Sequence, residues 1–223
     1  MILRCNRRSA AAVLAALLMI VFMTGVAAAQ ELEPRFFSQV PVGMNFAAVS
    51  SMHMEGGVQF DQAAGIEDAT GEIWGVGAGY LRTLGVFGVS SKLSIVVPVM
   101  WGDWQGLYLG EPASASRRGL ADPGAEWSVN FIGAPAMAMC EMRGFQQKWV
   151  VGASQKVTVP LGQYDPSKLL NLGTNRWGFR TRLGASRKFT RFTFEAMGSV
   201  WLYTANDDFF GGNTLEQRPL WSA

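Results

Sequence analysis

The chain has 223 residues, with 19 Lys and Arg against 17 Asp and Glu, so no basic excess points to nucleic acid as a partner. It has one histidine and two cysteines, which excludes a histidine-based metal cluster and a zinc site built from several thiols. The length is enough for one domain of ordinary size.

The first 29 residues have the three parts of a secretory signal peptide. Three arginines form the start, residues 10–26 form an apolar core, and the alanines at 27–29 form a cleavage site. A retained transmembrane helix is the alternative, because an apolar span of about 17 to 25 residues can cross a bilayer. The small residues before Gln30 and the lack of a later apolar run favour cleavage.

Cleavage changes the charge and the cysteine content of the mature chain. It would leave 194 of the 223 residues and remove three of the 19 basic residues, giving 16 basic against 17 acidic side chains and a net charge of −1. Cys5 would leave with the signal, so Cys140 would have no partner for a disulfide within the chain. Residues 30–43 are expected to be an extended lead-in, because Pro34 and Pro41 disfavour a helix.

Residues 44–223 are expected to form one β domain, because seven segments show the two-residue period of strands. In residues 148–159, for example, Trp149 and Val151 share one parity, whereas Ser154 and Lys156 share the other. Each strand should therefore have one apolar and one polar face. The expected strands are residues 44–57, 72–84, 89–100, 124–132, 148–159, 176–186 and 192–203.

Some stretches do not follow this pattern. Three glycines share one parity of residues 72–84, which indicates a bend or the close packing of another element. Residues 101–123 are expected to be irregular, and residues 136–142 are a candidate for a short helix. The end of the chain, from Trp221, is the candidate start of an eighth strand.

The predicted connections differ in length between the two ends of the strands. The expected connections are 85–88, 133–147 and 187–191 at one end, and 58–71, 101–123, 160–175 and 204–220 at the other. Short turns on one side and long loops on the other are typical of outer-membrane β-barrels. Strands of this length can also cross a bilayer when tilted, and lipid cannot satisfy an open sheet edge.

Aromatic residues near strand ends fit the interfacial girdles of such a barrel. They are Trp74, Trp101, Trp127, Trp149, Trp177 and Tyr203. A soluble β-sandwich produces the same alternation and uses single tryptophans as core anchors, so it stays open as an alternative. The sequence favours an all-β, antiparallel, up-and-down transmembrane β-barrel.

Several motifs resemble those of the "putative MetA-pathway of phenol degradation" family of transporter-like proteins. The matching motifs are Pro41-Val42-Gly43-Met44-Asn45-Phe46, Asp122-Pro123, Asn130-Phe131-Ile132-Gly133-Ala134-Pro135-Ala136-Met137, Gly152-Ala153-Ser154, Pro160-Leu161-Gly162-Gln163-Tyr164-Asp165, Asn171-Leu172-Gly173-Thr174-Asn175-Arg176-Trp177 and Asn206-Asp207-Asp208-Phe209-Phe210-Gly211-Gly212. The resemblance covers residues 34–223.

The resemblance implies an outer-membrane β-barrel involved in the uptake of aromatic or other hydrophobic compounds. It implies no catalytic residues. Members of the family continue beyond the position of Trp221 with further strands, so the sequence is expected to be a C-terminally truncated barrel, with seven to eight strands of a larger one. Bacterial barrels have an even number of strands, from eight upward.

Charged and polar residues on the polar parity are the candidates to line the lumen. They are Asn45, His53, Glu55, Lys92, Glu126, Asn130, Lys156, Arg176, Arg180, Arg182 and Glu195. Mixed charges inside a barrel select the solutes that pass. Alternatively, these side chains pair across strands and fill a narrow lumen.

Two chemical alternatives are weaker. A lipid-acting outer-membrane enzyme would need His53 beside a serine nucleophile, and Ser51, which shares its parity, is only a loose neighbour. Residues 206–208 with Asn213 are a candidate calcium loop, but their spacing departs from the helix-loop pattern, so a solvated turn is favoured.

The sequence therefore predicts a non-enzymatic outer-membrane channel for passive uptake of small hydrophobic or aromatic compounds. A secreted soluble β-sandwich binding module is the main alternative, and the lipid-acting enzyme the less favoured one. No cofactor and no metal are expected. The expected partners are outer-membrane lipid, a small hydrophobic or aromatic solute and the barrel-assembly machinery, in a Gram-negative bacterium that exports the chain through its cleaved signal.

Overall fold

The computed structural model describes residues 33–58 and 65–223, and this part of the chain is built almost entirely from β-strands. The strands are β1 (Asn45–Gly57), β2 (Ile66–Val86), β3 (Val89–Tyr108), β4 (Glu111–Leu120), β5 (Gly124–Ile132), β6 (Trp149–Thr158), β7 (Gly178–Phe189), β8 (Phe192–Tyr203), β9 (Asn206–Phe209), β10 (Asn213–Leu215) and β11 (Leu220–Ser222). Two short 3₁₀ helices, Glu141–Gly144 and Phe210–Gly212, complete the elements. The predicted signal peptide at 1–29 lies outside the described residues.

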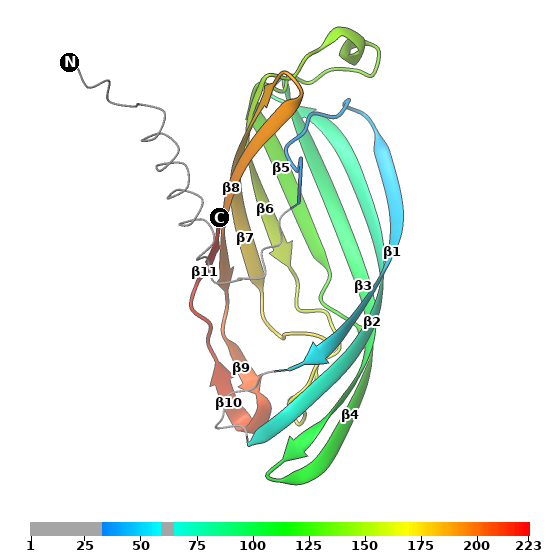
Figure 1. Ribbon diagram of the computed structural model, residues 1–223, viewed down its shortest axis with the longest axis vertical. Coiled ribbons are helices and arrows are strands. Elements are labelled where there is room, and N and C mark those ends of the chain that lie inside the picture. The colour runs from blue at the N-terminus through cyan, green and yellow to red at the C-terminus, as the bar shows by residue number, and fades with distance from the viewer. Residues whose placement is uncertain (1–32, 59–64) are drawn as a thin grey trace, which may run out of the picture. The chain divides into compact units, whose positions relative to one another are not determined.

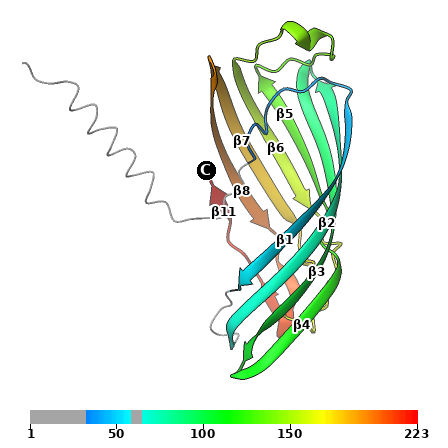
Figure 2. The same ribbon diagram turned by 45° about the vertical axis from the view of Figure 1, so that its right-hand side comes forward.

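One large antiparallel sheet contains nine of the strands, in the order β1-β2-β3-β5-β6-β7-β8-β11, with β4 paired to β3. Consecutive strands pair from β1 to β4 and from β5 to β8, as in an up-and-down barrel, and β5 pairs with β3. The sheet curls strongly (Figures 1 and 2). A separate two-stranded sheet joins β9 and β10. The predicted all-β, antiparallel, up-and-down fold is therefore confirmed.

All seven strands predicted from the alternation are present. β5 and β8 have the predicted bounds, and β1, β6 and β7 differ from them by three residues or fewer at each end. β11 begins at Leu220 and lies next to β8 in the sheet.

The prediction that residues 101–123 are irregular is wrong. β3 continues to Tyr108, and β4 folds back along it, so that Val99 pairs with Leu120 and Tyr108 with Glu111. Similarly, β2 begins at Ile66 and is longer than predicted. Alternation of apolar and polar residues does not reveal β4, because most of its residues are small, polar or charged. The loop asymmetry is accordingly smaller than expected.

Two tight turns join β2 to β3 and β3 to β4. In each, both central residues have positive φ: 51° and 77° at Phe87 and Gly88, and 53° and 84° at Leu109 and Gly110. Two-residue turns of this kind have the twist of antiparallel hairpins, which is why a glycine is needed in each. The long β2-β3-β4 ribbon follows from these turns.

The residues between β5 and β6 form a connection with little regular structure. The predicted helix over 136–142 is wrong, because the only helical turn there is the 3₁₀ helix Glu141–Gly144. Pro135 forms an isolated bridge with Val89, which holds the connection against the start of β3. Cys140 is exposed in this connection.

The outer face of the sheet is apolar and exposed to its surroundings. Leu183, Phe194 and Val49 are 60%, 65% and 77% exposed, and many other large apolar side chains share this face. A sandwich would cover such a face with a second sheet, and none does so in the described part of the chain. The structure therefore contradicts the β-sandwich alternative.

Tryptophans mark both ends of this apolar face on β6 and β7. Trp149 begins β6, and Trp177 immediately precedes Gly178, which pairs with Thr158. The two tryptophans are thus about ten residues apart along the sheet, roughly 33 Å at the rise of a strand. At a tilt of about 40° this spans about 25 Å, the height of the apolar band of an outer-membrane barrel.

The opposite, inner face carries the segment before β1. Within residues 34–43, Phe37 is buried and contacts the backbones of Gly152 and Gly184. Asn130 Nδ2 donates to Phe37 O at 2.9 Å, and Thr83 Oγ1 donates to Pro41 O at 2.6 Å. We call residues 34–43 the N-terminal plug, because they run along the inner side of the curled sheet (Figure 2).

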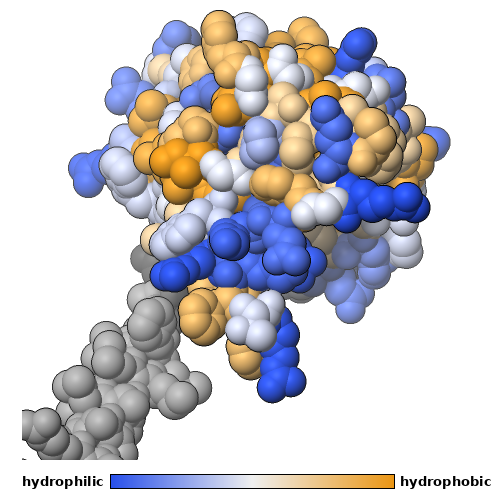
Figure 3. Space-filling view, turned by 90° about the horizontal axis from the view of Figure 1, so that it is seen from above, coloured by the Kyte–Doolittle hydropathy of each residue, from blue (hydrophilic) through white to orange (hydrophobic). Residues whose placement is uncertain are grey.

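The sequence predicted an extended lead-in, but the plug is not extended over its whole length. Residues 34–37 form a turn, in which Ser38 N donates to Arg35 O and Arg35 has a φ of 58°. Figure 3 shows the molecule from the end that carries the 133–147 connection. On this surface, apolar side chains lie beside polar ones. No helix in the described residues is long and apolar enough to span a membrane.

Candidate solute-binding site

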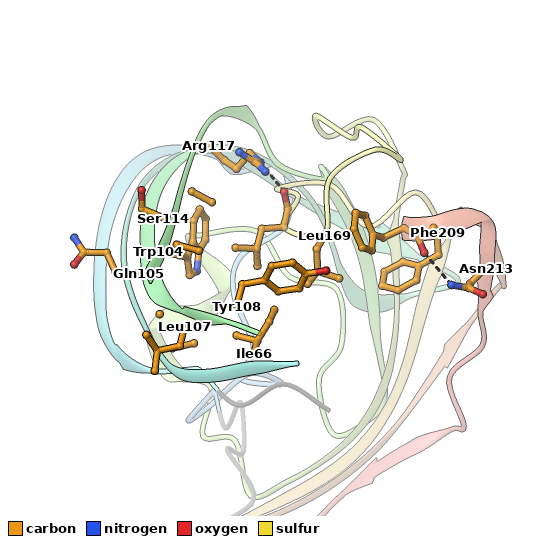
Figure 4. A pocket seen from close by; sticks show the side chains of 17 residues that line it. Ile66, Trp104, Gln105, Leu107, Tyr108, Ser114, Arg117, Leu169, Phe209 and Asn213 are labelled. Carbon is orange, nitrogen blue, oxygen red and sulfur yellow. Dashed lines mark hydrogen bonds between the residues drawn. The ribbon is translucent and has the colours of Figure 1, made fainter. Parts of the chain in front are cut away.

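An apolar pocket of about 590 Å³ lies at the end of the sheet where β3 and β4 meet (Figure 4). Its walls come from the β2-β3-β4 ribbon on one side, and from the β6-β7 connection and β9 on the other. The lining residues are Ile66, Ala69, Trp104, Gln105, Gly106, Leu107, Tyr108, Ala113, Ser114, Ala115, Arg117, Leu169, Leu170, Phe209, Phe210, Gly211 and Asn213. This size and this lining are typical of a site for a small molecule.

Trp104 forms the wall on the ribbon side. Its indole lies flat across two glycines: a Cβ at Gly102 would stand 2.6 Å from its Cη2, and one at Gly71 would stand 2.7 Å from its Cδ1. Trp104 is 9% exposed, and Tyr108 follows it on the same face of β3. The two glycines therefore make room for the ring that shapes the pocket.

Leu169 and Phe209 form the opposite wall and face Trp104 and Tyr108 across the pocket (Figure 4). Leu170 also lines the pocket. The β6-β7 connection reaches this position because Arg117 Nε donates to Leu170 O at 2.6 Å. The contact joins β4 to the connection, so the two walls are linked by a direct hydrogen bond.

Asp122 fixes the two ends of the β6-β7 connection. Its Oδ1 accepts from Gly162 N at 2.8 Å, and its Oδ2 accepts from Thr174 N and Thr174 Oγ1, both at 2.7 Å. Gly162 and Gly173 are in direct contact at this point. One carboxylate thus joins the beginning and the end of the connection.

A buried asparagine joins the same connection to the segment after β8. Asn206 is 1% exposed, and its Nδ2 donates to Tyr164 OH at 2.9 Å and to Thr174 O at 3.2 Å. Its Oδ1 accepts from Asn175 Nδ2 and from Asp208 N. These contacts place β9, and hence Phe209, beside the pocket.

The calcium alternative for residues 206–213 gains no support from these contacts. The Asn206 side chain is hydrogen-bonded to Tyr164, and the Asn213 side chain donates to Phe210 O. In the described residues, no three His, Cys, Asp or Glu side chains gather as metal ligands do.

Asp165 stabilises a turn within the β6-β7 connection. Hydrogen bonds from Ser167, followed by the hydrogen bond and ion pair with Lys168, lower the pKa of Asp165 to about 2. Because the pKa is lowered, the charged carboxylate stabilises the turn fully at pH values above the ordinary pKa of 3.8. This stabilisation is lost as the pH falls through the pKa of about 2.

Eight of the predicted lumen residues occupy the inner face. The register pairs Glu126 with Lys156 and Lys156 with Arg180, so these three lie side by side. The others on this face are Lys92, Asn130, Arg176, Arg182 and Glu195. That they line a path for solute stays a prediction.

The structure brings most of these eight residues together through specific contacts. Arg180 Nη2 lies 3.2 Å from Glu126 Oε2, in a pair whose side chains are 2% and 12% exposed. Ser154 Oγ donates to the other oxygen of Glu126 at 2.7 Å. The Arg180 guanidinium also stacks on Trp201, with 4.7 Å between Cζ and the ring centre.

Lys92 and Arg182 hold the N-terminal plug. The Lys92 ammonium donates to Phe36 O and lies 5.0 Å from the centre of its ring, and the Arg182 guanidinium lies 4.1 Å from the same centre. Cations above an aromatic face are attracted by its quadrupole. Glu195 accepts from Arg35 N at 2.9 Å at the start of the plug.

The three predicted lumen residues on β1 need correction. Asn45, His53 and Glu55 pair with Arg82, Trp74 and Glu72, which lie on the outer face. The prediction places the more apolar face of β1 toward lipid. In the structure, that face turns inward, where Met52 packs against Gly75.

His53 has neighbours that do not form a nucleophilic site. Its ring stacks on Trp74, with 3.9 Å between ring centres, and its Nε2 lies 3.2 Å from Glu72 Oε1. Ser51, the proposed nucleophile, pairs with Val76 on the same outer face. Tyr203, counted among the girdle residues, lies instead on the inner face under the Arg176 guanidinium.

Comparisons with known proteins agree with this architecture. The crystal structure of the COG4313 outer membrane channel from Pseudomonas putida F1 has a similar fold, with a TM-score of 0.66 and 18% sequence identity. The likeness covers 86% of this chain and 68% of that one. No curated protein sequence gives a match. The model of the family described as "Putative MetA-pathway of phenol degradation" matches residues 47–223, so the chain belongs to this family.

Proposed function

We propose that the protein is an outer-membrane channel for the passive uptake of small apolar or aromatic compounds, which bind first in the pocket between the β3-β4 hairpin and the β6-β7 connection. The apolar pocket carries the proposal. It lies at one end of a curled sheet whose outer face is apolar enough for lipid. In this proposal the partners are outer-membrane lipid, the solute and the barrel-assembly machinery that inserts exported chains.

The inner face supports a narrow path rather than a wide water-filled one. The N-terminal plug occupies the curve of the sheet and is held by Lys92, Asn130, Arg182 and Thr83. Small polar solutes would have to pass these side chains and the buried Phe37. The pocket, by contrast, offers an apolar solute a surface that replaces water.

The location is tested by fractionating a Gram-negative host that expresses the full chain. We expect the protein in the outer membrane, released only by detergent, with an electrophoretic mobility that changes on heating. Recovery of the folded protein from the soluble fraction would contradict the proposal.

The uptake is tested with a radiolabelled apolar aromatic solute and the same host without the protein as reference. We expect faster initial uptake in cells that express it. As a control, Leu169→Asp and Phe209→Asp together should abolish the gain, because they place two charges in the apolar wall of the pocket. Equal uptake with and without the protein would refute the proposed function.

A further inference from the structure

We infer that the channel selects amphipathic anions, in which a carboxylate is attached to an apolar body. This inference rests on the proposed function and adds the substrate class. It is built on the charge inside the pocket and on the charges of the inner face below it.

The pocket contains a single charged side chain among the described residues that line it, and that side chain is Arg117. The rest of the lining is aromatic, aliphatic or small and neutral. No carboxylate lines the pocket, and no ion pair with Arg117 occurs in the described part of the chain. An apolar pocket with one unbalanced guanidinium complements a molecule with one negative charge.

The guanidinium of Arg117 has N–H groups that remain available to bind the carboxylate of a solute. Its Nε donates to Leu170 O at 2.6 Å and its Nη1 donates to Ser116 O at 2.7 Å, which fixes the plane of the guanidinium at the edge of the pocket (Figure 4). Its Nη2 donates to no side chain or carbonyl of the described residues. A fixed guanidinium with remaining N–H groups binds carboxylates with good geometry.

The inner face continues the positive potential away from the pocket. Among the eight predicted lumen residues on this face, Lys92, Lys156, Arg176, Arg180 and Arg182 are cations and Glu126 and Glu195 are carboxylates, so the cations of this set exceed its carboxylates by three. Surrounding protein of low dielectric strengthens such a field. A solute anion that leaves Arg117 therefore moves along a favourable potential, whereas a cation is repelled.

The inference is tested by equilibrium binding of two matched probes, 4-phenylbutyrate and 4-phenylbutan-1-ol, to the full chain in zwitterionic nanodiscs, with empty nanodiscs as the blank. The probes share an apolar body and differ in charge. We expect the carboxylate to bind about tenfold more tightly, as hydrogen bonds to a charged group predict. Equal affinities, or tighter binding of the alcohol, would overturn the inference while leaving the proposed function intact.

The variant Arg117→Gln tests whether Arg117 in the pocket causes the preference for the carboxylate. We expect this variant to lose the preference for the carboxylate, with the affinity for the alcohol within about twofold of that of the unaltered protein. Arg118→Gln is the matched control, because Arg118 pairs with Trp101 on the outer face and should keep the preference. A preference that survives in Arg117→Gln would refute the role of Arg117.

Further measurements distinguish a misfolded variant, or a protein that binds no solute, from a protein that binds a different class of solute. The heat-dependent mobility of each variant reports whether it folds, and Arg117→Lys, which keeps the charge, should retain part of the preference if the guanidinium acts by charge. Binding of neither probe by the unaltered protein would overturn the proposed function, and with it this inference.

Discussion

At the scale of single residues, glycines decide the shape of the pocket by admitting larger side chains. Trp104 can lie flat on β3 because Gly102 and Gly71 have no Cβ in its place. In the same way, Phe37 of the plug occupies the space over Gly152 and Gly184. At two places on the inner face, one aromatic ring thus lies over two glycines.

We predict that Gly102→Ala weakens the binding of an apolar solute about fivefold or more. The new Cβ would come within 2.6 Å of the indole and force it from its position, and overpacking of this kind costs about 1–3 kcal/mol. Solute titration in nanodiscs measures the effect. Gly144→Ala, in open space, is the control and should bind normally. Unchanged affinity in Gly102→Ala would show that Trp104 does not shape the site.

At the scale of elements, the pocket depends on connections that are held by side chains rather than by strands. Asp122 fixes both ends of the β6-β7 connection, and Asn206 joins that connection to β9. These residues fall in the motifs that the chain shares with its family. Their hydrogen bonds order a connection that has no regular backbone hydrogen bonding of its own.

We predict that Asp122→Ala loosens the β6-β7 connection without unfolding the sheet. The change removes three hydrogen bonds to a carboxylate, and each such bond contributes about 1.5–3 kcal/mol. Trypsin should then cut after Lys168, which lies in the loop and is about half exposed, at least tenfold faster than in the unaltered protein. Asp207→Ala, at an exposed position, should leave the rate unchanged; equal rates in both variants would refute the role of Asp122.

At the scale of the whole molecule, the curled sheet separates two environments. The outer face exposes large apolar side chains mainly from β2, β3 and β5 to β8, and the inner face collects charged groups, polar groups and the plug. Such a distribution reverses that of a soluble protein and is stable only when lipid covers the outer face.

We predict that Leu183→Arg strongly impairs folding into lipid. Leu183 is 60% exposed on the outer face of β7, midway between the levels of Trp149 and Trp177, and an arginine at the middle of a bilayer costs about 2–4 kcal/mol. Urea titration in liposomes measures the loss. Leu161→Arg, the same change at a 63% exposed position in the β6-β7 connection, should have little effect. If both variants lost stability equally, the outer face would not be in contact with lipid.

The sequence by itself determined the seven main strands and their antiparallel order, because two-residue alternation is a local property. It did not determine the β3-β4 hairpin, because β4 consists mostly of small, polar and charged residues and shows no apolar alternation. Only the tertiary structure decided that the apolar side of β1 turns inward, because that orientation depends on its register with β2. It also decided that the plug fills the inner face and that Trp104, Leu169 and Phe209 meet around Arg117, since these residues are far apart in the chain and are brought together by the curl of the sheet.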